Sequence, residues 1–307
     1  MAFDQKILQA QISLGSGVFA GGSNSSTVLA FGGNAGGQQL QSGLRMSAII
    51  EVVGGQGQGT LRLAIYGLTL QHMNQLTTLG TQYWQYQGKN TITLQAGTGT
   101  TGLSIVFKGL IYNAYMDASA MPQVCFRLEA TAAGGYDAVK PVAPVSSSGS
   151  MDVTQMLQQL AGQMGLQFEN NGVNAKLMNP YYPGNAWTQA LRIAKHAGVD
   201  MVIDKGTMAI MPAGKSRNGG GATVAPPKMV GYPTFREAGL IVKSIWDPSY
   251  SPSQTITVQS SVTPACGTWL VNKLTHELDT LVPHGKWFTT MECSNPNNPG
   301  AAPRPTS

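Results

Sequence analysis

The stretch TITLQ at residues 91–95 alternates apolar and polar side chains with a strict period of two, and LSIVFKGLIYNAY at residues 103–115 is rich in β-branched and aromatic residues. Both patterns are typical of β-strands. The loop between them, GTGTTG at residues 97–102, matches the G-x-G-x-x-G pattern of dinucleotide-binding sites, but such a site needs a helix after the glycines. Because a strand pattern follows instead, we expect a β-hairpin.

Further strands are expected on both sides of this hairpin. LRLAIYGLTL (residues 61–70) and VCFRLEAT (residues 124–131) have strand-like patterns, and a helix-like segment at about residues 70–79 interrupts them. The region before Ser42 is rich in Gly, Ser and Asn, and we expect it to be a long arm or an ordered loop. Residues 1–132 are therefore predicted to be a β domain with a Gly/Ser-rich N-terminal arm.

The middle of the chain changes from strand patterns to helix patterns. Residues 133–150 are dominated by Gly, Pro and Ser and are predicted to be a linker. Residues 151–214 are predicted to form a small α+β domain with two helices, a short strand and a β-hairpin that turns at Lys205 and Gly206. A second Gly- and Pro-rich segment, residues 215–231, is predicted to be another linker.

Capping residues mark the ends of the two expected helices. Asp152 or Thr154 is expected to cap the first helix, and Asn185 the second, because their side chains accept hydrogen bonds from free N–H groups. Gly198 is expected to end the second helix. Apolar side chains at helical spacing are expected to face a core: Met156, Leu157, Leu160, Met164, Trp187, Leu191 and Ala194.

Residues 232–294 return to strand patterns and repeat the first block. Three pairs of segments match in hydrophobic pattern: TITLQA (91–96) with TITVQS (255–260), FKGLIYNAYMD (107–117) with WLVNKLTHELD (269–279), and VCFRLEAT (124–131) with WFTTMECS (287–294). The pairs occur in the same order and about 163 residues apart. We therefore predict a duplicated β domain. The tail, residues 295–307, has no apolar side chain larger than alanine or proline, and we expect it to be disordered or extended.

The C-terminal block carries several short motifs at strand ends. An Asp-Pro pair (Asp247, Pro248) follows a strand that ends at Trp246, and a GTW sequence with Trp269 leads to His276-x-Leu-Asp279. A Gly-x-Trp sequence that ends at Trp287 precedes the last strand. With LAIYGLTLQHMNQLTTLG in the first block and the helix–helix–hairpin pattern of the middle block, the chain resembles the baseplate hub (tail hub) proteins of tailed bacteriophages over most of residues 45–294.

This resemblance implies a mainly β fold with two tube-like β-barrel domains, at residues 1–132 and 232–294, and a small α+β insertion. It implies a homotrimer whose six barrels form a pseudo-sixfold ring. The ring would join the sixfold tail tube protein to the threefold central spike protein, contact other baseplate proteins, and enclose a lumen for DNA or tape-measure protein. The expected location is the baseplate of a virion assembled in the host cytoplasm, and a contractile tail is favoured. The candidate structural or interface residues are Trp246, Asp247, Pro248, Trp269, His276, Asp279 and Trp287.

The composition argues against several kinds of chemistry. Charged residues make up 11% of the chain, against roughly 25% in an average domain, which fits a surface covered in an assembly. The net charge is +5, but the sequence contains no long basic run that would indicate a nucleic-acid site. The three cysteines and four histidines have no metal-ligand spacing. The sequence has no apolar segment typical of a signal peptide or membrane helix. We predict no catalytic site, cofactor or metal, and no membrane contact.

An alternative is a tail-tip module that binds a polysaccharide or degrades peptidoglycan. Trp84, Trp246, Trp269 and Trp287 could stack on sugars, and two carboxylates that lie close together only in space could form a glycosidase site. In β domains such tryptophans more often pack in the core or at subunit interfaces. The absence of a G-x-S-x-G motif and the small number of acidic residues, 14, favour the structural role.

Overall fold

The computed structural model describes residues 5–14, 27–32, 39–41, 43–54, 57–77, 90–132, 141–219, 221–236 and 239–296. Strands make up 52% and helices 13% of the structure, which confirms the mainly β class. The chain divides into two compact units, which are described separately. The first contains Met1–Ile50, Thr60–Tyr136 and Glu277–Trp287, and the second contains Glu51–Gly59, Asp137–His276 and Phe288–Ser307.

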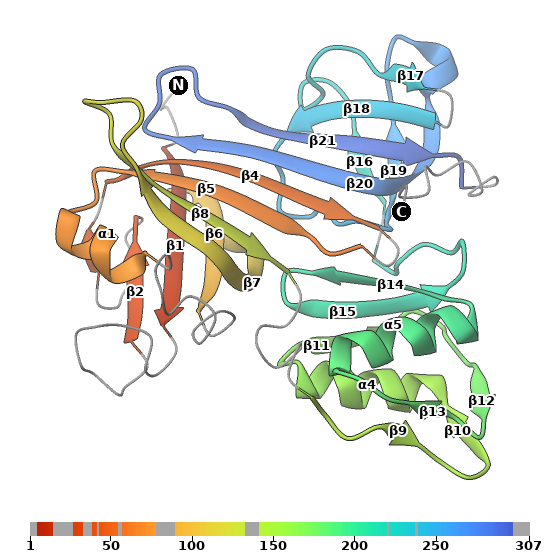
Figure 1. The fold of residues 1–307 in the computed structure, drawn as a ribbon. Coiled ribbons are helices and arrows are strands. Elements are labelled where there is room, and N and C mark those ends of the chain that lie inside the picture. Colours follow the sequence, from red (N-terminus) through yellow and green to blue (C-terminus); the bar gives the residue numbers. More distant parts are fainter. Residues whose placement is uncertain are drawn as a thin grey trace. The chain divides into compact units, whose positions relative to one another are not determined.

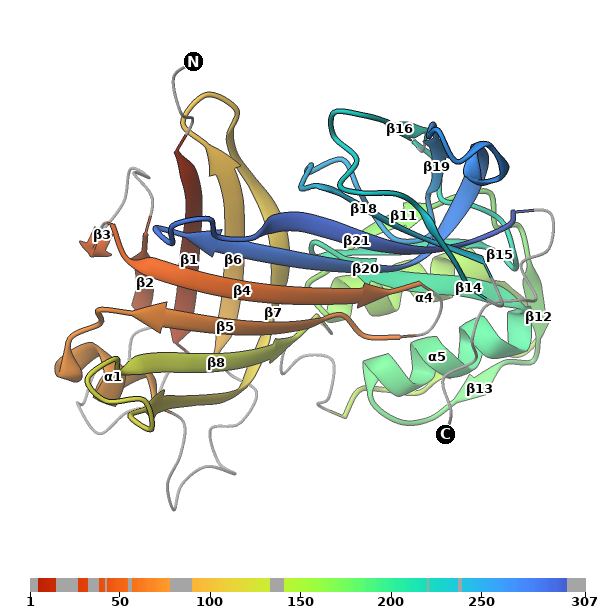
Figure 2. The same ribbon diagram turned by 90° about the horizontal axis from the view of Figure 1, so that it is seen from above.

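The first unit is built on a sheet with the strand order β4–β5–β8–β7–β6–β1–β2–β3. Figure 2 shows β4, β5 and β8 as neighbouring strands, and α1 (Leu70–Leu76) lies at one end of them. The Thr69 side chain caps α1 by accepting a hydrogen bond from the N–H of His72. The strands are β1 (Lys6–Leu14), β2 (Thr27–Phe31), β3 (Gln39–Gln41), β4 (Arg45–Val53), β5 (Thr60–Tyr66), β6 (Thr91–Thr98), β7 (Gly102–Asp117) and β8 (Cys125–Thr131).

The structure corrects the expected N-terminal arm over residues 6–14. These residues form β1, which pairs antiparallel with both β2 and β6. The alternating sequence LQAQISL places Leu8, Ala10, Ile12 and Leu14 on one buried face of the strand. Burial of that apolar face explains why a segment before a Gly-rich region becomes part of the sheet.

The predicted hairpin at residues 91–115 is confirmed. β6 and β7 pair antiparallel from Thr91 and Leu110 to Thr98 and Gly102, so GTGTTG closes a hairpin. β7 then pairs antiparallel with β8, and the register shifts near Asn113. A Cβ atom on Gly109 would lie 2.2 Å from the backbone oxygen of Thr131. The close approach of β7 and β8 therefore requires glycine at this position.

The α+β part of the second unit packs two helices against the three-stranded sheet β11–β15–β14 (Figure 1). The Asp152 side chain caps α4 by accepting hydrogen bonds from the N–H groups of Thr154 and Gln155, so of the two expected caps it is Asp152 that is used. Asn185 caps α5, and Gly198 ends it with φ +62°, as predicted. The elements are α4 (Val153–Gln163), α5 (Ala186–Ala197), β11 (Gln167–Asn170), β14 (Val199–Asp204) and β15 (Thr207–Pro212), with the two-stranded sheets β9 (Val145–Ser146)–β13 (Tyr181–Tyr182) and β10 (Ser150–Asp152)–β12 (Lys176–Met178).

One apolar core holds the α+β part together. The expected core residues of α4, which include Met156 and Leu160, are fully buried, and Ala194 of α5 is buried with them. Trp187 and Leu191 are partly buried against the same cluster. The helical spacing of these residues therefore predicted the buried faces of both helices.

The remaining strands of the second unit have the order β17–β18–β21–β20–β19–β16. β16 lies in the segment expected to be a second linker and pairs parallel with β19. Residues 222–224 are therefore part of the sheet. The elements are β16 (Ala222–Val224), β17 (Thr234–Arg236), β18 (Gly239–Ile245), β19 (Thr255–Val258), the 3-10 helix η1 (Thr263–Ala265), β20 (Gly267–Thr280) and β21 (Trp287–Ser294).

The two β parts share a strand order. In the first, four successive strands lie in the order β5–β8–β7–β6, and in the second β18–β21–β20–β19 lie in the same order. The three segment pairs that match in sequence lie on β6 and β19, on β7 and β20, and on β8 and β21. No closed barrel is formed by the strands that the structure describes, so two closed barrels stay a prediction.

Candidate functional site

The candidate residues fall into two groups. Trp246, Asp247 and Pro248 directly follow β18, and Trp269 and His276 lie on β20 in the second unit. Asp279 and Trp287 belong to the first unit. Trp246, Asp247 and Pro248 begin the turn after β18, residues 246–253, which we call the β18 corner.

Asp247 shapes the β18 corner. One carboxylate oxygen accepts hydrogen bonds from the Ser249 N–H (3.0 Å) and hydroxyl (2.6 Å), and the other accepts one from Lys228 Nζ (2.9 Å). Burial alone would raise the pKa of Asp247, but the hydrogen bonds from Ser249 and Lys228 outweigh it and lower the pKa. An ionised Asp247 therefore holds the chain reversal at Pro248, which is a structural role for the Asp-Pro motif.

Lys205 connects the β14–β15 hairpin to this corner. Its ammonium group donates hydrogen bonds to the backbone oxygens of Pro248 (2.8 Å) and Tyr250 (3.1 Å) and to the Ser251 hydroxyl (3.3 Å). Burial lowers the pKa of Lys205. Three acceptors satisfy all three N–H groups of the ammonium, which explains how a lysine is tolerated there.

Arg217 provides a second connection, from the segment that leads to β16. Its guanidinium group pairs with Glu169 of β11 (2.5 Å) and Asp204 of β14 (3.4 Å), and its backbone N–H donates to the Ser253 oxygen (2.6 Å). The hydrogen bonds from Arg217 lower the pKa of Glu169. Lys205 and Arg217 together fix the α+β part to the β18 corner. The sequence patterns did not identify either connection, because each joins residues that are far apart in the chain.

His276 is buried, with 2% of its surface exposed, and its Nδ1 lies 2.8 Å from the Thr289 hydroxyl. Burial, and secondarily the charge of Lys205, lowers the pKa of His276 to about 3. The side chain is therefore neutral at ordinary pH and serves as a hydrogen-bonded core residue.

The tryptophans of the second unit are also structural. Trp246 is buried, with 7% of its surface exposed. Trp269 packs beside the apolar cluster around Val271 and donates a hydrogen bond from Nε1 to the Ala265 oxygen (2.9 Å). The burial of Trp246 removes the open ring face that a stacked sugar needs, and Trp269 is partly buried. Trp84 lies outside the described residues.

Asp279 lies near the end of β20, and Trp287 is the first residue of β21, so both flank the turn of the hairpin between these strands. The Asp279 carboxylate accepts hydrogen bonds from the Ser47 hydroxyl (2.6 Å) and from the Lys286 N–H (2.9 Å). Trp287 is buried, and Lys6 Nζ lies 5.8 Å from its ring centroid. These contacts tie the hairpin to β4 and β1 within the first unit.

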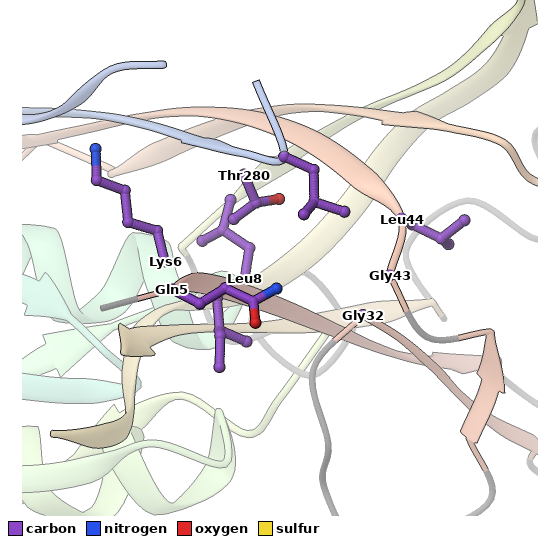
Figure 3. A pocket seen from close by; sticks show the side chains of 9 residues that line it. Gln5, Lys6, Leu8, Gly32, Gly43, Leu44 and Thr280 are labelled. Carbon is purple, nitrogen blue, oxygen red and sulfur yellow. The ribbon is translucent and has the colours of Figure 1, made fainter. Parts of the chain in front are cut away.

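The described residues contain no candidate metal centre, because no group of three or more His, Cys, Asp or Glu side chains among them could hold a metal ion. A pocket between the start of β1 and the loop after β20 measures about 80 Å³, and Leu8, Gly32 and Thr280 help to line it (Figure 3). Small-molecule sites usually measure ~300–1,000 Å³, so this pocket is too small for a substrate. Of the helices described, none has both the length and the apolar character needed to cross a membrane.

Comparisons with known proteins agree on one family and one fold. The chain matches the family described as baseplate hub gp41 over residues 26–293. No curated protein matches it. Its fold is similar to that of the 43 kDa tail protein of prophage MuSo2 from Shewanella oneidensis, with a TM-score of 0.53 and 11% identity over 83% of this chain and 98% of that chain.

Two further solved structures are similar. One is the E. coli c3393 protein, described as a component of the type VI secretion system with structural similarity to the T4 bacteriophage tail proteins gp27 and gp5 (TM-score 0.57, 11% identity, 84% of this chain and 75% of that chain). The other is a tail protein from Neisseria meningitidis MC58 (TM-score 0.56, 8% identity, 95% and 97%). At these identities the likeness shows a shared fold, whereas the family match covers most of the chain. The chain therefore belongs to the baseplate hub gp41 family and is a structural protein of the baseplate or tail of a phage or of a related tail-like particle.

Proposed function

We propose that three copies of this chain form the ring that joins a sixfold tail tube to a threefold central spike. Each chain contributes two tube-like β domains, residues 1–132 and 232–294, and these alternate around the ring. Residues 151–214 form an α+β elaboration between them. The lumen of the ring passes DNA or tape-measure protein, and the ring contacts other baseplate proteins in the virion.

The shared strand order is the observation that carries this proposal. The orders β5–β8–β7–β6 and β18–β21–β20–β19 are the same, and the matching sequence segments lie on equivalent strands. Three copies of a chain with two similar domains form six similar surfaces, which match a sixfold partner. The same three chains also form three surfaces of another kind, which match a threefold partner. A duplicated chain of this kind is a simple solution to the symmetry mismatch.

The surroundings of the candidate residues favour a structural role over the polysaccharide alternative. Trp246 and Trp287 are buried, and Trp269 uses its indole N–H within its own domain. We propose that Asp247, Pro248, His276 and Asp279 maintain the β domains and their turns and that the protein has no catalytic turnover. Clear lysis of peptidoglycan by the pure protein in a zymogram would contradict this.

The mass of the purified protein in solution tests the assembly. Multi-angle light scattering should give three times the chain mass of 32.3 kDa, alone or after addition of the spike protein. A mass of six chains in the presence of both spike and tube proteins would rule out the trimeric adaptor. A particle lacking the protein altogether would rule out the hub role.

A further inference from the structure

A second pocket, of about 390 Å³, lies in the first unit between the ends of β4 and β5, the start of α1 and the turn before β8. Its volume falls within the ~300–1,000 Å³ of typical binding sites. Leu68, Met73, Pro122 and Val124 are apolar residues among those that line it. Met121, which precedes Pro122, is 72% exposed. The pocket and its rim therefore offer a place for a large apolar side chain.

Arg45 is the one charged residue among those that line this pocket. Its guanidinium carbon lies 3.8 Å from the centroid of the Tyr66 ring, so the two groups stack. Stacking fixes the guanidinium plane and leaves the N–H groups along its edge available. Among the described residues, ion pairs involve Arg127, Arg217, Arg236 and three lysines. None of these ion pairs involves Arg45.

We propose that this pocket binds a segment of a partner protein that carries a carboxylate beside a large apolar side chain. The carboxylate would form two parallel hydrogen bonds with Arg45, and the apolar side chain would lie on Leu68 and Met73. A nucleic acid fits less well, because its phosphates need several cations and the pocket has one beside apolar lining residues. The inference rests on the proposed function only in that the partner belongs to the same tail particle.

Methyl NMR of the full chain with labelled methionines tests the site directly. The signals of Met73, which lines the pocket, and of the exposed Met121, which precedes the lining residue Pro122, are assigned with M73L and M121L. The probe is the peptide acetyl-Gly-Leu-Asp-Gly-amide, and its matched control has Asn in place of Asp. The Asp peptide should shift the Met73 and Met121 signals at millimolar concentration, and the Asn peptide should bind about tenfold more weakly, because only a carboxylate makes charge-assisted bonds to arginine.

Two arginine variants separate this site from a general charge effect. R45Q should remove the preference for the Asp peptide, whereas R62Q, at an exposed arginine of β5 that does not line the pocket, should keep it. If R45Q fails to fold, the comparison of the Asp and Asn peptides on the unchanged protein still tests whether the pocket prefers a carboxylate. Equal binding of both peptides, or shifts confined to other methionines, would overturn the proposal.

The mass of the protein in solution distinguishes a different partner protein from a second copy of this chain as the occupant of the pocket. If R45Q lowers the oligomeric state of the protein alone, the pocket is occupied by a second copy of this chain, and the proposal of a different partner fails. If the peptides do not bind but the chain still forms trimers in the tail particle, the proposed function stands without this site. If this chain binds the Asp peptide specifically but is absent from tail particles, the proposed binding site stands and the hub role is overturned.

Discussion

His276 shows how one buried titratable residue links stability to pH. Its pKa is about 3 in the folded protein, against 6.5 when it is exposed, so between these values only the unfolded chain takes up the proton. The folded state is therefore fully stabilised above pH 6.5 and loses stability as the pH falls towards 3. The hydrogen bond between Nδ1 and Thr289 does not prevent this, because burial disfavours the charged ring.

The substitution H276N removes the titrating ring and keeps a polar side chain opposite Thr289. Between pH 6.5 and 5, the free energy of unfolding of the unchanged protein should fall faster than that of H276N, by up to about 1.4 kcal/mol per pH unit. Urea denaturation at a series of pH values measures this difference. Parallel curves would mean that His276 is not held neutral in the folded protein.

The three cysteines should differ sharply in reactivity. Cys125 and Cys293 are buried, with 4% of the surface of each exposed, and burial raises the pKa of Cys293 to about 12. Cys266 is exposed, although its sulfur lies near the Ser260 oxygen. A disulfide reagent should titrate one thiol per native chain and three after unfolding, and C266S should remove the native signal. Rapid reaction of a second thiol in the native protein would contradict the burial of Cys125 or Cys293.

At the scale of elements, Arg217 holds three pieces of the second unit in place. Its side chain is 11% exposed, and that of its partner Asp204 is 4% exposed. Removing the guanidinium would leave the buried Asp204 carboxylate without its ion-pair partner, which usually costs about 3–5 kcal/mol. R217M should therefore lower the free energy of unfolding by an amount in this range.

Two further variants test whether the loss of stability comes from the unpaired Asp204 carboxylate. The double variant R217M/D204N should regain part of the loss, because it removes the uncompensated charge. R236M is the matched control: Arg236 is 63% exposed in its pair with Glu292, so the loss should stay below about 1 kcal/mol. Calorimetry or urea denaturation measures all three. Equal losses for R217M and R236M would show that the buried cluster has no special role.

Local patterns predicted most elements but not the contacts that join them. Caps at Asp152 and Asn185 and the stop at Gly198 depend on neighbours within a few residues, and so the sequence predicted both helices. The Gly-rich region after β1 favours an arm or a loop, although LQAQISL alternates strictly as a strand does. β16 has three residues, too few for any period, and it exists because β19 offers a partner.

The contacts of the candidate residues could not be predicted in the same way. The motif Asp247-Pro248 indicated a turn, but the approach of Lys205 depends on the packing of a hairpin more than 40 residues away in the chain. The strand HELD indicated that His276 and Glu277 point to opposite faces, and His276 is indeed the buried one. The alternation of the strand indicates which face His276 lies on, but it does not indicate that Thr289 is the hydrogen-bond partner of His276.

At the scale of the whole molecule, the two β parts and the α+β part should differ in symmetry. If three chains form the ring, the strands β5–β8 and β18–β21 occur six times in similar positions, because their order is the same. The helices α4 and α5 occur once per chain and therefore three times per ring. Lys205 and Arg217 connect the α+β part to the β18 corner, so the α+β part should follow the second β part and not the first.

An image reconstruction of the tail particle by electron cryomicroscopy, calculated without imposed symmetry, makes this testable. Averaging the hub layer sixfold should preserve density for the shared strands and should weaken the density of the α+β part to about half, because only three of the six positions contain it. Averaging threefold should restore that density to full strength. Six full-strength copies of α4 and α5 would show that the ring contains six chains. Loss of the density of the shared strands on sixfold averaging would show that the two β parts do not occupy equivalent places. Either result would remove the basis for a trimeric symmetry adaptor.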